Sequence, residues 1–222
     1  MPSFKIQKLD FLIALYIFCI LVSELMGGKT FFITSIGNFK LNASTAIFLF
    51  PIVFSINDIV TEVYGAERAR SIIRSGLLMV FFMFLFTILA TILPPSTRSA
   101  PTEKAYDQIF STTTRIAAAS LVAFAIADFL DVAIFVKLRK KMKNSGLWLR
   151  NNFSNFVSQL CDTVIFMTLA FYAFDKTGAD NFSFLISLIL PYWLLKCSMS
   201  IIETPFVYLG VKWLRKDDVQ TA

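Results

Sequence analysis

Histidine is absent from this 222-residue chain, and charged residues make up only 16% of it, against about 25% in a typical soluble domain. Without His, serine–histidine hydrolysis and other His-based acid–base catalysis are excluded, and the commonest zinc ligand is missing. Any proton relay must therefore use carboxylates. The scarcity of charge is typical of a protein whose solvent is a lipid bilayer.

Cysteine is also scarce, since only Cys19, Cys161 and Cys197 occur, each inside an apolar run and without CxxC spacing. Such residues are ordinarily small core residues and not metal or redox sites. The chain lacks the GxSxG and GxxxxGK[ST] motifs, so it uses ATP only through a separate subunit. We therefore expect no cofactor, no metal site and no enzymatic activity.

Apolar residues, in contrast, make up 56% of the chain and include 25 Phe. A membrane-spanning helix needs roughly 20 mostly apolar residues. Six segments qualify, with bounds near 10–26, 43–64, 71–93, 113–137, 151–174 and 183–211. No A-x-A-like cleavage site follows the first segment, so it is expected to remain as a helix. The sequence predicts an all-α membrane protein, a bundle of six transmembrane helices forming one integral membrane domain over residues 1–222.

The distribution of Lys and Arg predicts the orientation of this bundle. With the N-terminus inside, fourteen of the 21 basic residues fall in cytoplasmic segments and five fall on the opposite side. Because basic residues of short loops favour the cytoplasm, both termini are expected there. The net charge of +6 then reflects topology and not nucleic-acid binding, which needs basic residues clustered on one folded face. A homo-oligomer is compatible with the sequence.

Ionisable residues inside the predicted spans are the candidate functional groups, because such groups are costly in lipid and face a bundle interior or cavity. They comprise seven acids and two cations: Glu24, Asp58, Glu62, Asp128, Asp131, Asp162, Glu203, Arg115 and Lys196. All the acids except Glu24 lie roughly 9 to 15 Å from the cytoplasmic boundary, at about 1.5 Å per residue. Several helices therefore bring acids to one level, which indicates a single central site.

Two structural alternatives accompany this reading. The polar groups can bridge neighbouring helices, and Lys196, in the middle of its span, is expected to pair with Asp131 or Asp162. Glu24 and Arg115 lie near the outer ends of their helices, from which their side chains can reach the interface.

Irregular segments are also expected. Three prolines, Pro51, Pro191 and Pro205, flank the polar positions and are expected to bend helices around a cavity. The outer loop 94–110, rich in Pro, Ser and Thr, is expected to be irregular.

Four stretches carry a family resemblance: FPIVFSINDIVTEVYGAERARSII (50–73), TRIAAASLVAFAIADFLDVAIFVKLRK (114–140), WLRNNFSNFVSQLCDTVIF (148–166) and LLKCSMSIIETPFVYLGV (194–211). They resemble the queuosine precursor transporters, the YhhQ-like or VUT family of vitamin uptake transporters. The ND-x-x-TE-x-YG, LDV and CDT elements make the resemblance specific. The residues that match the family's motifs, and that it implies as substrate-binding, are Asn57, Asp58, Glu62, Arg115, Asp131, Gln159, Asp162, Lys196 and Glu203.

The resemblance implies a bacterial inner-membrane, multi-pass transporter that imports a 7-deazaguanine, such as 7-cyano-7-deazaguanine, its aminomethyl analogue or queuine, for tRNA queuosine salvage. The expected partners are this nucleobase-like small molecule and the lipid bilayer, and no nucleic acid. A carboxylate accepts the adjacent N–H groups of a guanine-like edge, and aromatic rings stack on its plane. Near the polar positions these rings are Phe54, Phe153, Phe156 and Tyr192. Two alternatives stay open: a substrate-binding subunit of an ATP-driven vitamin-type importer, and an intramembrane enzyme acting through Asp128 and Asp131.

Overall fold

The computed structural model describes residues 7–37, 39–141, 147–202 and 204–218. Within these ranges, side chains are described except at 36, 39, 128–141, 147–156, 158, 199–202, 204 and 216–218. Among the described residues, five helices are long and apolar enough to cross a membrane: Lys8–Met26, Thr45–Tyr64, Ala66–Ile92, Ala100–Ala127 and Gly178–Ser198. A shorter apolar helix covers Gln159–Phe171. The structure is therefore mostly helical and has several helices suited to crossing a membrane, as the sequence predicts.

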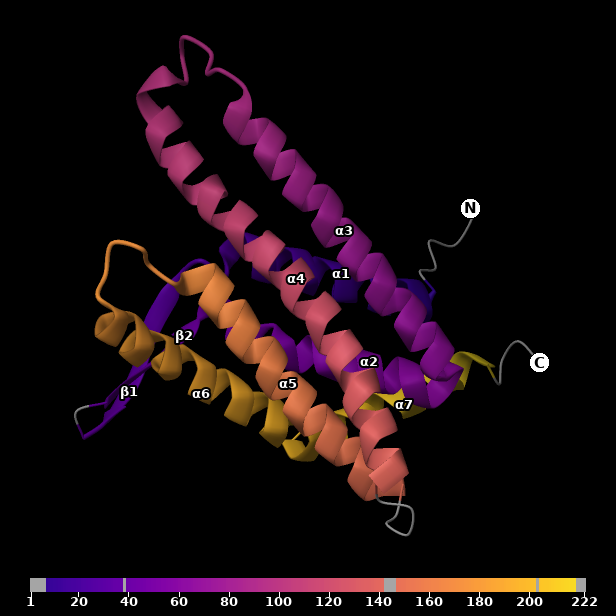
Figure 1. Ribbon diagram of the computed structural model, residues 1–222. Helices are drawn as coiled ribbons and strands as arrows, with labels where there is room; N and C mark the ends of the chain where they lie inside the picture. The colour runs from indigo at the N-terminus through magenta and orange to yellow at the C-terminus, as the bar shows by residue number, and fades with distance from the viewer. Residues whose placement is uncertain (1–6, 38, 142–146, 203, 219–222) are drawn as a thin grey trace, which may run out of the picture.

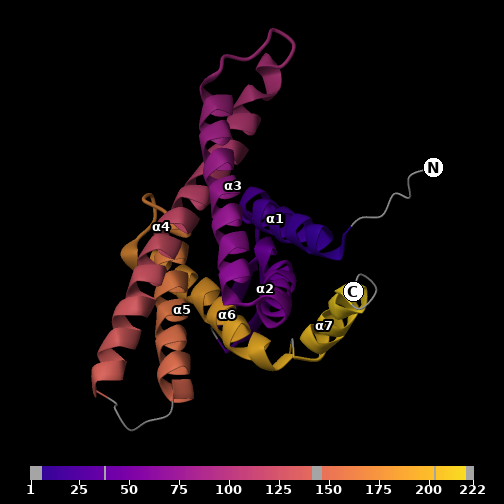
Figure 2. The same cartoon turned by 90° about the vertical axis from the view of Figure 1, so that its right-hand side faces the viewer.

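The elements follow one another as α1 (Lys8–Met26), β1 (Thr30–Ile36), β2 (Phe39–Ser44), η1 (Thr45–Phe48), α2 (Phe50–Tyr64), α3 (Ala66–Ile92), η2 (Ala100–Thr102), α4 (Glu103–Lys141), α5 (Leu147–Phe171), α6 (Gly178–Ile202) and α7 (Thr204–Asp218). Helices α3 and α4 form a long antiparallel pair whose connecting turn projects beyond the other elements (Figure 1). Helix α5 packs beside α4, and α6 packs beside α5 and the hairpin, while α1 and α7 lie against α2 (Figure 2).

The β-hairpin was not expected from the sequence. Strands β1 and β2 pair antiparallel, with Ile36 opposite Phe39, so that only Gly37 and Asn38 separate them. Gly37 has φ 61°, a conformation that favours glycine and is typical of two-residue hairpin turns. The base of the hairpin packs on α6, where the Asn42 amide donates to the Ser187 hydroxyl at 2.8 Å. The hairpin therefore lies beside α6, and its tip projects away from the helices (Figure 1).

The second predicted span, 43–64, begins later as an α-helix. Ser44 ends β2 and caps the 3-10 turn η1, since its side chain accepts from the Ala46 N–H at 3.3 Å. Pro51 lies in the first turn of α2 and does not interrupt it, contrary to the prediction. Proline suits this position because the first helical N–H groups have no partner within the helix.

The predicted helix 183–211 covers two elements, α6 and α7, which lie on either side of residue 203 and run in different directions (Figure 2). Pro191 lies inside α6, as expected, but Pro205 lies in the first turn of α7 and begins a helix. Helix α7 reaches the end of the bundle where α1 begins, since the Lys8 ammonium donates to the Trp213 carbonyl at 2.6 Å. The outer loop is also shorter than predicted, because α4 starts at Glu103 and not near 113.

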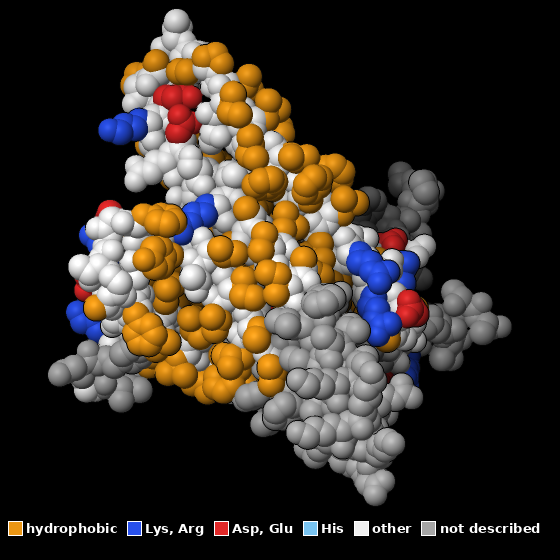
Figure 3. Space-filling model, in the orientation of Figure 1, with side chains coloured by type: hydrophobic (Ala, Val, Ile, Leu, Met, Phe, Trp, Pro, Cys, Tyr) orange, Lys and Arg blue, Asp and Glu red, His pale blue; other side chains and the backbone are white. Residues whose placement is uncertain are grey.

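Three clusters of buried apolar residues hold these helices together, of which the smallest joins α4 and α5. One joins α1, α2, α3 and α7 through buried Tyr16, Ile56 and Leu214 among others. The second joins β2, α5 and α6 around Met167 and Leu188, which are fully buried. The outer face of α3 instead exposes large apolar side chains, among them Phe81, Phe82, Phe86, Leu89 and Ile92. This face forms part of a broad apolar surface, as expected for contact with lipid tails (Figure 3).

A close approach of α7 to α2 at Gly210 gives a first testable prediction. A Cβ added at Gly210 would contact Ile59 Cδ1 and lie 2.8 Å from Ile59 Cγ1, and Ile59 is buried. Gly210→Ala is therefore expected to destabilise the protein by about 1–3 kcal/mol, the usual cost of overpacking. Thermal unfolding of the detergent-solubilised protein measures this change.

The same substitution at another glycine supplies the control. Gly178→Ala adds a methyl group where no atom lies within 4 Å, so it should leave the melting temperature nearly unchanged. Adding Ile59→Val to Gly210→Ala removes the clashing Cδ1 but keeps the carbon at the Cγ1 position, so it should restore stability only in part. Equal stability of both single variants would contradict the close packing of α7 on α2.

Candidate functional site

Helices α1 to α6 and the base of the hairpin together line a cavity of about 220 Å³. Most of its wall is apolar, with a few polar side chains, among them Glu24, Ser120, Asp162, Thr163 and Lys196. The volume lies below the range of about 300–1,000 Å³ that is typical of pockets for drug-sized ligands. The cavity therefore suits a small ligand with a few polar groups.

An ion pair on α5 and α6 is the first polar feature of this cavity. The Lys196 Nζ donates to Asp162 Oδ2 at 2.7 Å and to Thr163 Oγ1 at 3.1 Å. The two charged side chains are only 13% and 29% exposed. Asp162 is one of the two partners predicted for Lys196. Because a mid-membrane charge without a partner is costly, this pair stabilises both charges inside the bundle.

Glu24 of α1 is the second polar feature. The residue is 7% exposed and lines the cavity, and its Oε1 accepts a hydrogen bond from the Ser120 hydroxyl of α4 at 2.6 Å. Of the two readings of Glu24, the alternative in which its side chain reaches the interface is contradicted by this burial, and the reading as a group that faces the bundle interior fits the structure. Tyr16, Ile20, Glu24 and Gly27 all line the cavity at helical spacing. This spacing on one face of α1 is the signal that was available in the sequence.

Aromatic side chains form much of the remaining wall. Phe50 and Phe54 of α2 stack with ring centroids 5.9 Å apart, and Tyr192 of α6 meets Phe50 edge-on at 5.5 Å. The Tyr192 hydroxyl donates to the Ser44 carbonyl at 3.2 Å, which fixes the ring. Phe54 and Tyr192 were both predicted near the site. Such rigid rings offer stacking surfaces to a flat ligand.

The remaining predicted residues of α2 are divided between two places. The Asn57 side chain hydrogen-bonds Tyr16, which lines the cavity, so Asn57 contacts the site through this ring. Asp58 and Glu62 instead line a second hollow of about 460 Å³ between α2 and α7. The step from Asn57 to Asp58 turns the helix by about 100°, which directs Asp58 away from the cavity. Glu62 lies 3.5 Å from Arg215 at the exposed surface, where ion pairs contribute little.

Arg115 belongs to α4. Its side chain contacts the C-terminal end of α5 and lies outside the cavity lining. Its Nε donates to the Leu169 carbonyl at 2.8 Å and its Nη2 donates to the Tyr172 carbonyl at 2.6 Å. The Leu169 carbonyl belongs to the last turn of α5 and the Tyr172 carbonyl follows its last residue, and acceptors at a helix end have no partners within the helix. The contacts of Arg115 are therefore those of a cap for this helix.

Gln159 has an exposed side chain, and its backbone carbonyl accepts from the Thr163 hydroxyl at 2.8 Å. The side chains of Asp128, Asp131, Phe153 and Phe156, and the whole of Glu203, lie outside the described residues.

A cavity with a few buried polar side chains, inside a bundle of apolar helices, is the arrangement of a protein that carries a small solute through a membrane. Comparison with known proteins narrows this class. The family described as "Putative vitamin uptake transporter" matches residues 44–210. The chain belongs to this family, and it is accordingly a multi-pass membrane transporter and not an enzyme.

Three curated bacterial relatives carry more specific names. A "Probable queuosine precursor transporter" of Bacillus subtilis is 29% identical over 81% of this chain and 76% of its own length. The "Queuosine precursor transporter" of Escherichia coli is 28% identical over 56% of this chain and 53% of its own length. A "Probable queuosine precursor transporter" of Haemophilus influenzae is 27% identical over 61% of this chain and 54% of its own length. No solved structure gives a significant match to this chain.

Proposed function

We propose that this protein imports a queuosine precursor, a 7-deazaguanine base, across the bacterial inner membrane through the central cavity. The observation that carries the proposal is the cavity itself, in which a paired cation, a buried carboxylate and aromatic walls surround space for a small flat molecule. The names of the three relatives support the same substrate class. The deazaguanine ring offers matching N–H donors, a carbonyl acceptor and a stacking plane.

The protein is proposed to act alone as a secondary transporter or facilitator. Purified protein in liposomes should take up labelled 7-cyano-7-deazaguanine without any partner subunit, and the aminomethyl analogue and queuine should compete. Uptake that appears only after an ATPase subunit is added would instead identify a capture subunit of an ATP-driven importer. Competition by adenine at equal strength to guanine would exclude a site that reads a guanine-like edge.

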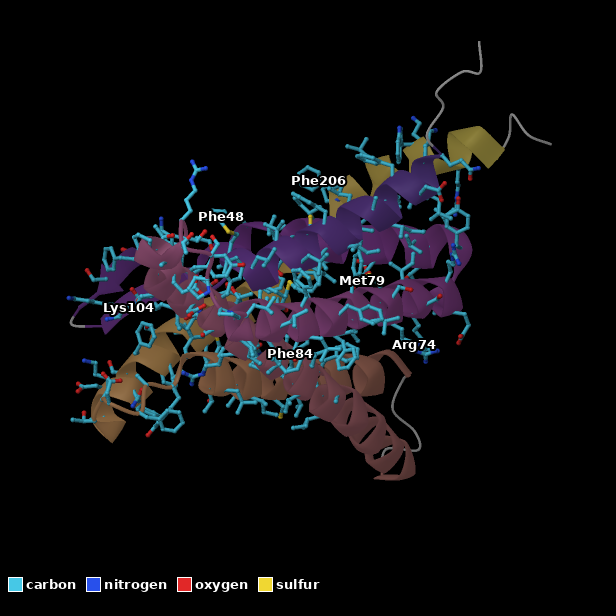
Figure 4. The ribbon with its side chains drawn as sticks, turned by 90° about the horizontal axis from the view of Figure 1, so that it is seen from above. Phe48, Arg74, Met79, Phe84, Lys104 and Phe206 are labelled. Atoms are coloured by element: carbon cyan, nitrogen blue, oxygen red, sulfur yellow. The ribbon has the colours of Figure 1, made fainter. Side chains whose placement is uncertain are left out.

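The proposed topology is one membrane domain over residues 1–222, with six crossings and both termini in the cytoplasm. In support, the exposed basic residues Arg68, Arg70 and Arg74 lie at the start of α3, in the turn region that follows α2. Figure 4 places Arg74 and Lys104 toward opposite ends of the molecule, with Met79 and Phe84 between them. Fourteen of the 21 Lys and Arg residues fall on the side assigned to the cytoplasm.

Single-cysteine labelling tests this orientation. In a background with Cys19, Cys161 and Cys197 replaced by Ala, Ala66→Cys should react only after the membrane is permeabilised, and Thr102→Cys should react in intact cells. Both positions are exposed in the structure. Ala66 begins α3, and Thr102 lies in the segment after its C-terminal end. Reaction of both positions from the same side would therefore rule out a crossing by α3.

A further inference from the structure

Glu24 has an acceptor that no described residue satisfies. Its Oε1 accepts from the Ser120 hydroxyl at 2.6 Å, while its Oε2 is buried and has no hydrogen-bond partner among the described residues. The whole residue is 7% exposed and lines the cavity. A buried carboxylate oxygen without a donor is unfavourable, because it has lost its hydration and gained nothing in return.

Lys196, the cation in the same cavity, does not donate to Glu24 Oε2. Lys196 has three N–H donors, and two of them are directed to Asp162 and Thr163. Asp162 thereby has a strong donor in its own neighbour, whereas Glu24 has only the neutral Ser120 hydroxyl. Of the two carboxylates described in the cavity, Glu24 is the one left to accept from a ligand.

We propose that Glu24 is the residue that selects the substrate, by accepting two adjacent N–H groups from the ring amide and exocyclic amine of a 2-amino-4-oxopyrimidine edge. This inference rests on the function proposed above and assigns its specificity to α1, outside the stretches that carry the family resemblance. A carboxylate with two oxygens in one plane matches two parallel donors, as in its bidentate pairs with Arg. The ring plane would stack against the Phe50, Phe54 and Tyr192 wall.

A ligand lacking the exocyclic amine tests the assignment directly. We would measure equilibrium binding of 7-cyano-7-deazaguanine, and of the same molecule without its 2-amino group, to purified protein in detergent. The unmodified protein should prefer the amino compound by about tenfold or more, since a buried acceptor left without its donor costs this much in binding. Glu24→Gln presents an amide N–H to a ligand that also donates, so it should bind the amino compound roughly 10- to 100-fold more weakly. The preference between the two ligands should fall to less than about threefold in this variant.

The matched control is Glu67→Gln, the same chemical change at an exposed surface residue of α3, which pairs with Arg70 at 2.9 Å. It should bind both ligands as the unmodified protein does. If Glu24→Gln does not yield folded protein, Glu24→Asp keeps the charge but withdraws it by one methylene. That variant should bind at least about fivefold more weakly while it retains the preference for the amino compound.

The outcomes separate this inference from the proposed function. Tight binding of 7-cyano-7-deazaguanine with no loss in Glu24→Gln or Glu24→Asp overturns the role of Glu24 and leaves the proposed function intact. Absence of ligand preference in the unmodified protein overturns it in the same way. No binding of any deazaguanine by folded, unmodified protein overturns both.

Discussion

Lys196→Met is expected to lower uptake of the proposed deazaguanine substrate roughly 100-fold and to lower the melting temperature of the protein. The substitution keeps a long side chain but removes the partner of Asp162, whose carboxylate lies 2.7 Å from the ammonium and is 29% exposed. Removing one member of a buried ion pair typically costs about 3–5 kcal/mol, and partial exposure places this pair at the lower end. Uptake should fall for a separate reason, because the ammonium donor to the substrate carbonyl is lost, and such a charged donor contributes about 1.5–3 kcal/mol, or a factor of roughly 10 to 150. Uptake into proteoliposomes and thermal unfolding in detergent measure the two effects.

A double variant separates stability from transport. Lys196→Met combined with Asp162→Asn removes both charges, so its melting temperature should recover toward that of the unmodified protein. Its uptake should stay low, because the cavity then lacks the cationic donor for the substrate carbonyl. Lys212→Met, at an exposed position of α7, is the control for loss of a lysine and should change neither property. Recovery of uptake in the double variant would show that the pair is only structural.

The helices could be predicted because length and apolarity decide whether a segment can cross a bilayer. The same criterion does not reveal the hairpin, because it assigns only apolar segments of roughly 20 residues and leaves residues 27–42 as a connection between two spans. A local signal was present in the Gly37 and Asn38 pair between two short β-prone runs. Pro205, interpreted from the sequence as a bend, lies in the first turn of α7, a position that suits proline because the N–H groups there have no partner within the helix.

The ion pair could be predicted because Lys196 lies in the middle of its span, where an unpaired cation is costly, and Asp162 was one of the two acids named as its partner. Glu24 was undervalued because depth was counted along single helices, and the cavity extends toward the end of α1 where Gly27 and Ser44 lie. The surroundings of Glu62 depend on α7, because the Arg215 guanidinium of this helix lies 3.5 Å from the Glu62 carboxylate although the two residues are far apart in the sequence. Contacts of this kind arise from the packing of whole helices, which no local pattern in the sequence specifies.

Arg115→Ala is expected to destabilise the protein by about 3 kcal/mol while leaving the affinity of the remaining folded protein for substrate unchanged. The guanidinium makes two short hydrogen bonds to the carbonyls of Leu169 and Tyr172 at the end of α5. Bonds from a charged donor contribute about 1.5–3 kcal/mol each, and the freed carbonyls at this helix end lose their cap. For a chain of this size the melting temperature should fall by roughly 10 °C.

Arg115→Lys distinguishes capping from substrate binding, because the family resemblance implies the second role and the contacts favour the first. A lysine keeps the charge near the helix C-terminus but loses the planar pair of donors, so stability should be intermediate between alanine and arginine. Substrate affinity, measured on folded protein after size-exclusion chromatography, should be the same for all three residues. An unchanged melting temperature together with weaker binding in Arg115→Ala would instead place this guanidinium in contact with the substrate, and the cavity assignment would then have to extend to the end of α5.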